Sequence, residues 1–147
     1  MIPSQGAYRL IKLFEGCKLS AYRCPANIVT IGWGSILDAQ GKPFKMGAII
    51  TQQQADDLLQ MEVDAKAVKV NLLISTVNQN MFDALVSFSY NCGVGALRGS
   101  TLLKKVKINP YDPLIHNEFM KWDKVAGKPL KGLTIRREAE SKLYFTT

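Results

Sequence analysis

The sequence EGCKLSAYRCPANIVTIGWGS, which runs from Glu15 to Ser35, decides the fold of the N-terminal part of this chain. Residues 28–33 are rich in β-branched side chains and, together with residues 19–23, predict two strands on either side of a turn. The turn is Cys24-Pro25-Ala26-Asn27, in which proline suits the first central position and asparagine tolerates a left-handed backbone. We therefore expect a short β-hairpin here.

A helix is predicted immediately before this hairpin. Ser4 is a good N-cap, and Gly16 is placed to end the helix. The apolar residues between them follow helical spacing and are Ala7, Leu10, Ile11 and Phe14. The helix end and the hairpin then bring together a carboxyl group, a thiol and a hydroxyl, from Glu15, Cys24 and Thr30. Such a set can flank one scissile bond.

The rest of the chain predicts helices. A capping box at residues 51–54 opens a helix that runs to about Val70, long enough to connect two lobes. Further helix starts are expected at a second box over residues 76–79, with Gly93 ending that helix, and at Ser100, Asp112 and Thr134. The predicted class is α+β, mostly helical, with a small N-terminal sheet.

Composition narrows the possible functions. The chain has 147 residues and a formal charge of +7, and its second half is the more basic. Such a field attracts an anionic polymer, namely nucleic acid, a lipid surface or an acidic cell wall, but no nucleic-acid recognition motif is present. Apolar runs are too short for a membrane span and the N-terminus lacks the pattern of a signal peptide, so we expect a soluble protein made in the cytoplasm.

The cysteine and histidine content argues against disulfides and metals. Three cysteines, Cys17, Cys24 and Cys92, are odd in number and irregularly spaced, which favours reduced thiols. His116 is the single histidine, so a Cys/His zinc site is not expected. We expect neither a metal nor a cofactor.

The pattern EGxxLxAYxCxxNxxTIGWG resembles the active-site segment of the phage-type lysozymes, the endolysins of glycoside hydrolase family 24. Three later segments follow in the order typical of these proteins: FDALVSFSYNCGVGALRGSTLLKK, EFMKWDKVAGKPLKGL and RREAESKLY. The resemblance implies one two-lobed lysozyme-like domain over residues 1–147. Its small β-containing lobe is expected at about 16–50, the connecting helix at about 51–70, and the helical lobe at about 71–147 together with the N-terminal helix.

The resemblance also implies a function. The expected substrate is bacterial peptidoglycan, cut at the β-1,4 bond between N-acetylmuramic acid and N-acetylglucosamine for host cell lysis. The enzyme is then expected to be a monomer that stays in the host cytoplasm until a separate holin opens the membrane, and that acts on the cell wall in the periplasm.

Glycosidic cleavage assigns a role to each candidate residue. Glu15 is the expected proton donor, because the negative end of the helix dipole and partial burial favour a protonated acid. Cys24 stands where the family usually carries Asp, and three roles are open: orienting water, acting as a partial thiolate, or bonding to the sugar. Thr30 is expected to hold the attacking water and Gly34 to contact a sugar. Arg136 or Arg137 is expected near the acid, with Arg136 favoured for the cleft.

Two other functions remain open from the sequence. A lytic transglycosylase needs only one acid and releases an anhydro sugar, which fits the missing Asp. A catalytically silent peptidoglycan-binding protein keeps the basic surface without the second carboxylate. Product analysis separates the first from a hydrolase, and cell-wall clearing separates the second.

Overall fold

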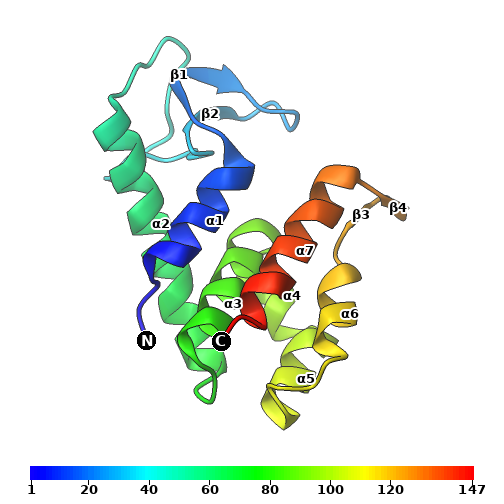
Figure 1. Ribbon diagram of the computed structural model, residues 1–147. Helices are drawn as coiled ribbons and strands as arrows, with labels where there is room; N and C mark the ends of the chain where they lie inside the picture. The colour runs from blue at the N-terminus through cyan, green and yellow to red at the C-terminus, as the bar shows by residue number, and fades with distance from the viewer.

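The computed structural model describes all residues from 1 to 147, and Figure 1 shows its seven helices and four short strands. In chain order they are α1 (Gln5–Glu15), β1 (Lys18–Arg23), β2 (Val29–Gly32), α2 (Gln52–Leu73), α3 (Gln79–Cys92), α4 (Val94–Arg98), α5 (Thr101–Ile108), α6 (Ile115–Met120), β3 (Lys124–Val125), β4 (Lys128–Pro129) and α7 (Lys131–Tyr144). The predicted α+β class, mostly helical with a small N-terminal sheet, is confirmed.

The predicted hairpin is present. Strand β1 pairs antiparallel with β2, with Tyr22 opposite Thr30 and an irregularity between Lys18 and Tyr22. At the turn, the Asn27 N–H donates to the Cys24 carbonyl at 2.7 Å, and Asn27 adopts a left-handed φ of 63°. The left-handed backbone that the sequence predicted for this asparagine is therefore confirmed.

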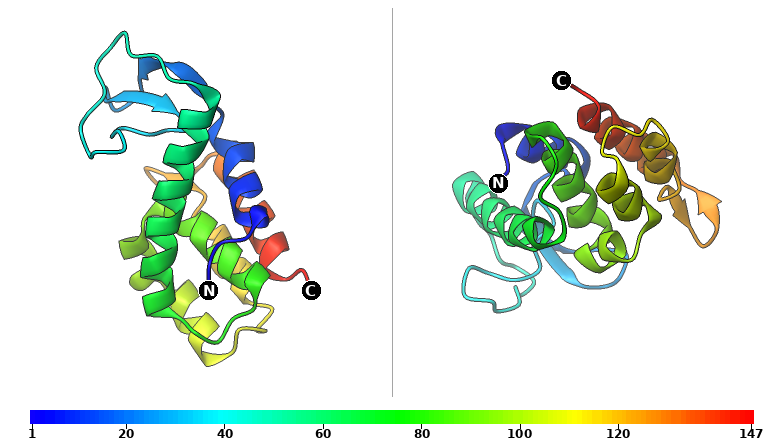
Figure 2. Two further views of the ribbon diagram at one scale, coloured as in Figure 1. Left: turned by 90° about the vertical axis from the view of Figure 1, so that its left-hand side faces the viewer. Right: turned by 90° about the horizontal axis from the view of Figure 1, so that it is seen from below.

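Helix α2 connects two regions of the molecule. Figures 1 and 2 show the β1–β2 hairpin and the loop that follows it at one end of α2, and the other helices packed around its opposite half. Helix α1 runs beside α2, to which it is tied by a hydrogen bond from the Tyr8 hydroxyl to Asp64 at 2.5 Å. The C-terminal end of α1 therefore reaches the junction between the β region and the helical region.

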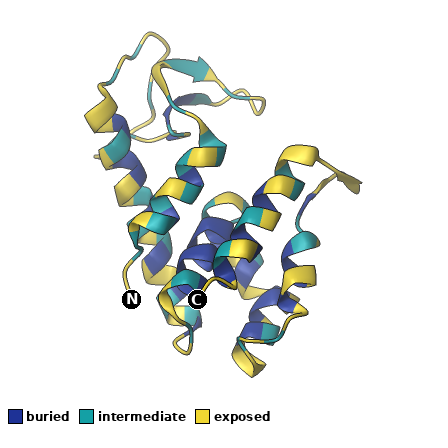
Figure 3. Ribbon diagram, in the orientation of Figure 1, coloured by how far each residue is buried: buried dark blue, intermediate teal, exposed yellow.

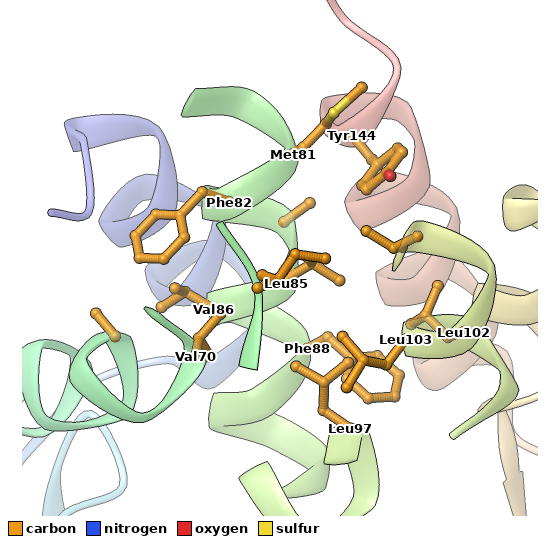
Figure 4. Close-up of a cluster of buried hydrophobic side chains, with 14 of the residues drawn as sticks. Val70, Met81, Phe82, Leu85, Val86, Phe88, Leu97, Leu102, Leu103 and Tyr144 are labelled. Atoms are coloured by element: carbon orange, nitrogen blue, oxygen red, sulfur yellow. The ribbon is translucent and has the colours of Figure 1, made fainter. Parts of the chain in front are cut away.

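Helix α3 is the centre of the helical region and contacts α1, α2, α4 and α7. Nine consecutive residues, from Met81 to Ser89, are buried, and Figure 3 shows how buried positions concentrate here. Phe88 packs edge-on against Phe119 and Trp122, with ring centroids 6.0 and 5.4 Å apart. Figure 4 shows the aliphatic side chains that complete this core, including Leu85, Leu97 and Leu102.

Three of the six predicted helix starts are confirmed by their hydrogen bonds. The side chains of Ser4 and Ser100 accept backbone N–H groups at the starts of α1 and α5, and Thr51 with Gln54 forms the complete capping box of α2. Gly93, with φ of 95°, ends α3 as expected. Each of these contacts spans only a few residues, so local sequence is enough to predict it.

Three predicted starts were wrong, and helix α4 and one β ribbon were not predicted. Helix α6 begins at Ile115, without a side-chain cap, rather than at Asp112. Helix α3 is capped by Asn78, whose side chain accepts the Met81 N–H at 3.0 Å, and not by the box at residues 76–79. Helix α7 begins at Lys131 rather than Thr134, whose hydroxyl donates to Asp123 at 2.8 Å. The β3–β4 ribbon was not predicted; its turn depends on left-handed backbone at residues 126 and 127.

The corrected cap of α3 gives a stability prediction. Asn78→Ala is expected to lower the free energy of unfolding by about 1 kcal/mol, because the Met81 N–H loses its acceptor. Thr76→Ala, two residues earlier, is the matched control and is expected to change it by less than about 0.5 kcal/mol. Urea unfolding of both variants measures the difference, and equal losses contradict the assignment of the cap.

Candidate active site

Glu15 is the last residue of α1, and its carboxylate contacts α7. Gly16 ends the helix with a left-handed φ of 64°. The Arg136 guanidinium donates from Nη1 to Glu15 Oε1 at 2.7 Å, across 121 positions of sequence. The Glu15 side chain is 23% exposed and the Arg136 side chain 5% exposed. The acid is therefore held in place but still reachable from solvent.

Arg136 and Arg137 have different surroundings. Arg136 lies over the Phe14 ring, 5.6 Å from its centroid, and points toward Glu15. Arg137 is fully buried and instead donates to Cys92 Sγ at 2.6 Å and to Asn91 Oδ1 at 2.8 Å. Of the two arginines that the sequence offers, Arg136 is the one in contact with the acid.

Cys24 and Thr30 lie together at the base of the hairpin turn. The Thr30 hydroxyl donates to the Ile28 carbonyl at 2.9 Å, and the Cys24 N–H donates to the same carbonyl at 3.0 Å. The pKa of the Cys24 thiol is lowered, chiefly by the backbone N–H of Ile28, with smaller help from Ala26 and the Thr30 hydroxyl, while desolvation opposes the change. At neutral pH a larger fraction of Cys24 is therefore thiolate than for an ordinary cysteine.

The two glycines of the TIGWG motif serve different purposes. Gly32 has a φ of 65° and is buried, and a Cβ there meets the Ala55 side chain at 3.3 Å. Its absent side chain lets β2 approach α2. Gly34 has a φ of 105° and is exposed, and a Cβ there lies 3.6 Å from Glu15 Oε2. Gly34 therefore keeps the space beside the acid open.

Glu62, on α2, is a carboxyl group of the site that sequence reasoning missed. Its Oε2 accepts a hydrogen bond from the Tyr90 hydroxyl at 3.3 Å, and that hydroxyl also lies 3.4 Å from the Trp33 carbonyl. Burial raises the pKa of Glu62 and the negative charge of Glu15 adds to the rise, whereas Ser35, Tyr90 and Lys66 oppose it. The only available signal was a glutamate near the buried face of a long helix, which is too common to be informative.

The raised pKa of Glu62 predicts a pH-dependent effect on stability. Between the unfolded and the folded pKa the native state binds more protons, so this group costs stability as pH rises through that window. Glu62→Gln is therefore expected to melt at a higher temperature than wild type at pH 7. The difference should vanish below the ordinary glutamate pKa of about 4.3. Thermal unfolding at pH 7 and pH 3.5 checks this, and a lower melting temperature at pH 7 contradicts it.

Of the candidate residues, Glu15 is partly exposed and Thr30 is buried. Hollows of about 510, 390 and 380 Å³ lie elsewhere, and none of the three is lined by Glu15, Cys24 or Thr30. All three cysteines are free, half-buried thiols, as their odd number and spacing predicted. No group of three or more His, Cys, Asp or Glu side chains is arranged to hold a metal ion.

Comparison with known proteins identifies the family. The family model described as phage lysozyme matches residues 12–140. The chain belongs to the phage lysozyme family. Within that family it is 39% identical over 146 residues to an endolysin of Bacillus phage B103, covering 97% of this chain but only 54% of that protein. It is also 39% identical over 140 residues to an endolysin of Acyrthosiphon pisum secondary endosymbiont phage 1, covering 92% of each.

A solved structure shares the whole fold of this phage lysozyme family member. The endolysin from Escherichia coli O157:H7 phage FAHEc1 superposes with a TM-score of 0.90 at 38% identity, over 99% of this chain and 94% of that one. The predicted family and lysozyme-like fold are thereby confirmed. Every helix of this chain is too short or too polar to cross a bilayer.

Proposed function

We propose that this chain is an endolysin, a muramidase that hydrolyses the β-1,4 bond between N-acetylmuramic acid and N-acetylglucosamine in peptidoglycan. The observation that carries the proposal is the carboxyl group of Glu15 at an open surface, held by Arg136, in a member of the phage lysozyme family. A glycan strand is a long polymer, so it needs an open surface rather than an enclosed pocket. The two named endolysins with similar sequences support the same reading.

In this mechanism Glu15 protonates the leaving oxygen of the scissile bond. A general acid must be within hydrogen-bond reach of that oxygen and must carry a proton when the bond breaks. The contact with Arg136 fixes the orientation of the carboxyl group. Glu62 lies close enough for the charge of Glu15 to raise the pKa of Glu62.

Cys24 and Thr30 then serve the attacking water. The lowered pKa of the thiol supports a role as partial thiolate, and a thiolate can accept a proton from water or attack the sugar directly. Thr30 is buried and its hydroxyl already donates to the Ile28 carbonyl, so its free lone pair is the part that remains for a water molecule. Gly34 leaves room for a sugar beside Glu15.

Digestion of purified peptidoglycan tests the proposal. Mass spectrometry of the products is expected to show reducing-end muramic acid. An anhydro end, lighter by one water, instead identifies a lytic transglycosylase. If the wild-type protein sediments with cell walls but releases nothing, it is a silent binding protein.

The biological setting is part of the same proposal. The formal charge of +7 favours binding to an anionic polymer such as the cell wall, and the sequence has no nucleic-acid recognition motif. We infer a monomer that remains in the host cytoplasm until a holin admits it to the periplasm. Expression in a bacterial host is then expected to leave cells intact until the membrane is permeabilised, and spontaneous lysis argues against holin dependence.

A further inference from the structure

We propose that Glu140 is a positioning residue for this reaction: its buried carboxylate holds Arg136, and through Arg136 its charge acts on the carboxyl group of Glu15. The inference rests on the proposed function, in which Glu15 is the general acid. Glu140 lies on α7, one helical turn beyond Arg136, and is completely buried. It therefore acts through Arg136 and not on the substrate.

Three groups hold the Glu140 carboxylate. Its Oε2 accepts a hydrogen bond from the Ser87 hydroxyl at 2.6 Å and lies 3.6 Å from Arg136 Nε. Its Oε1 lies 2.8 Å from Arg137 Nε. Ser87 is on α3, the central helix beside α7 in Figure 1, so the carboxylate is locked between two elements of the core.

Charge balance shows why this carboxylate matters for Glu15. Arg136 and Arg137 are both buried cations, and removing a partner from a buried ion pair is strongly unfavourable. Glu140 is within ion-pair distance of both, and Glu15 of Arg136 alone. When both carboxyl groups are ionised, the two arginines and the two glutamates together have no net charge. Without the Glu140 anion, Glu15 is the one carboxyl group left within ion-pair distance of Arg136.

Other titratable groups also face this cluster. Glu62 on α2 and Tyr90 on α3 face Glu15, and Cys92 on α3 faces Arg137. Burial raises the pKa of Glu140, and Arg137, Ser87 and Arg136 oppose that rise. Glu140 is distinguished from Glu62 by its direct contacts with both arginines, while Glu62 contacts neither.

The test is the pH profile of peptidoglycan cleavage by Glu140→Gln, which keeps the shape of the side chain but removes its charge. The basic limb of the profile is expected to move to lower pH by about one unit, the lower end of the range for a neighbouring charge. At the wild-type midpoint the rate should fall roughly fivefold, and well above the midpoint roughly tenfold. The wild-type profile, measured on the same substrate, shows the effect of substrate charge. Dividing each rate by the folded fraction from circular dichroism removes the effect of stability.

Two further variants separate charge from structure. Glu140→Asp keeps the charge and is expected to restore the wild-type limb. Glu118→Gln is the matched control, because Glu118 is also buried and paired, with Lys121 at 2.9 Å, but lies outside the cluster. If Glu140→Gln does not fold, Ser87→Ala replaces it, with a smaller shift in the same direction expected.

The proposal is overturned by an unchanged limb, by a shift to higher pH, or by an equal shift in Glu118→Gln. Those outcomes leave the proposed function intact. Failure of the proposed function looks different, because the wild type then releases no products, or Glu15→Gln cleaves as well as wild type.

Discussion

Replacing Glu15 by glutamine is expected to reduce the rate of peptidoglycan cleavage by about 10²–10⁴-fold, the usual contribution of a general acid. The amide keeps the size of the side chain and can still accept the hydrogen bond from Arg136, but it has no acidic proton for the leaving oxygen. Loss of turbidity of a purified peptidoglycan suspension measures the effect.

Loss of activity must be separated from loss of fold. Arg136 keeps Glu140 within ion-pair distance when Glu15 is neutral, so Glu15→Gln is expected to remain folded by circular dichroism. Glu138→Gln is the matched control, since Glu138 is an exposed glutamate on α7, two residues beyond Arg136, and this variant should cleave at the wild-type rate. An activity of Glu15→Gln within about tenfold of wild type removes Glu15 as the acid.

Alkylation of the wild-type protein by iodoacetamide is expected to reduce cleavage on the order of 10²-fold, as for loss of a base or nucleophile. Thiolate is the reactive form, and the lowered pKa of Cys24 makes this thiol react faster than Cys92, whose pKa is raised by burial. Cys24→Asp is expected to match or exceed the wild-type rate and to be spared by the reagent.

The other two thiols provide the controls for this experiment. Cys17→Ala and Cys92→Ala keep Cys24 and should remain sensitive to iodoacetamide, with mass spectrometry reporting which site has reacted. Equal inhibition of wild type and Cys24→Asp places the sensitive thiol elsewhere and removes Cys24 from the mechanism. Inactive but folded Cys24→Asp shows that a carboxylate does not replace the thiol here.

Local sequence predicted the elements of the fold well where one contact decides them. The caps at Ser4, Thr51 and Ser100 and the turn ending at Asn27 each depend on hydrogen bonds over two to four residues. The prediction was wrong where the sequence offers two alternative N-caps for one helix. Asn78 caps α3 in place of the box at residues 76–79.

Tertiary contacts explain that competition. The Gln79 amide donates to the Ile2 carbonyl at 2.9 Å, which ties the start of α3 to the N-terminal segment. Similarly, the Leu130 N–H donates to the Asp123 carbonyl at 2.9 Å, so α7 starts before Thr134. The first contact joins segments 77 positions apart, and the second closes the β3–β4 ribbon, which the sequence analysis did not predict.

The sequence by itself determined the hairpin, most of the helices and the resemblance to phage lysozymes, because hydrogen bonds within a turn and apolar spacing along a helix are local properties. It also placed Glu15, Cys24 and Thr30 within one short segment. The charged neighbours of Glu15, by contrast, come from distant parts of the sequence. Arg136 lies 121 positions from Glu15, and Glu62 reaches the site from α2. Packing of α1, α2 and α7 around α3 brings these charges together, and burial then makes them strong, which is information that no local pattern contains.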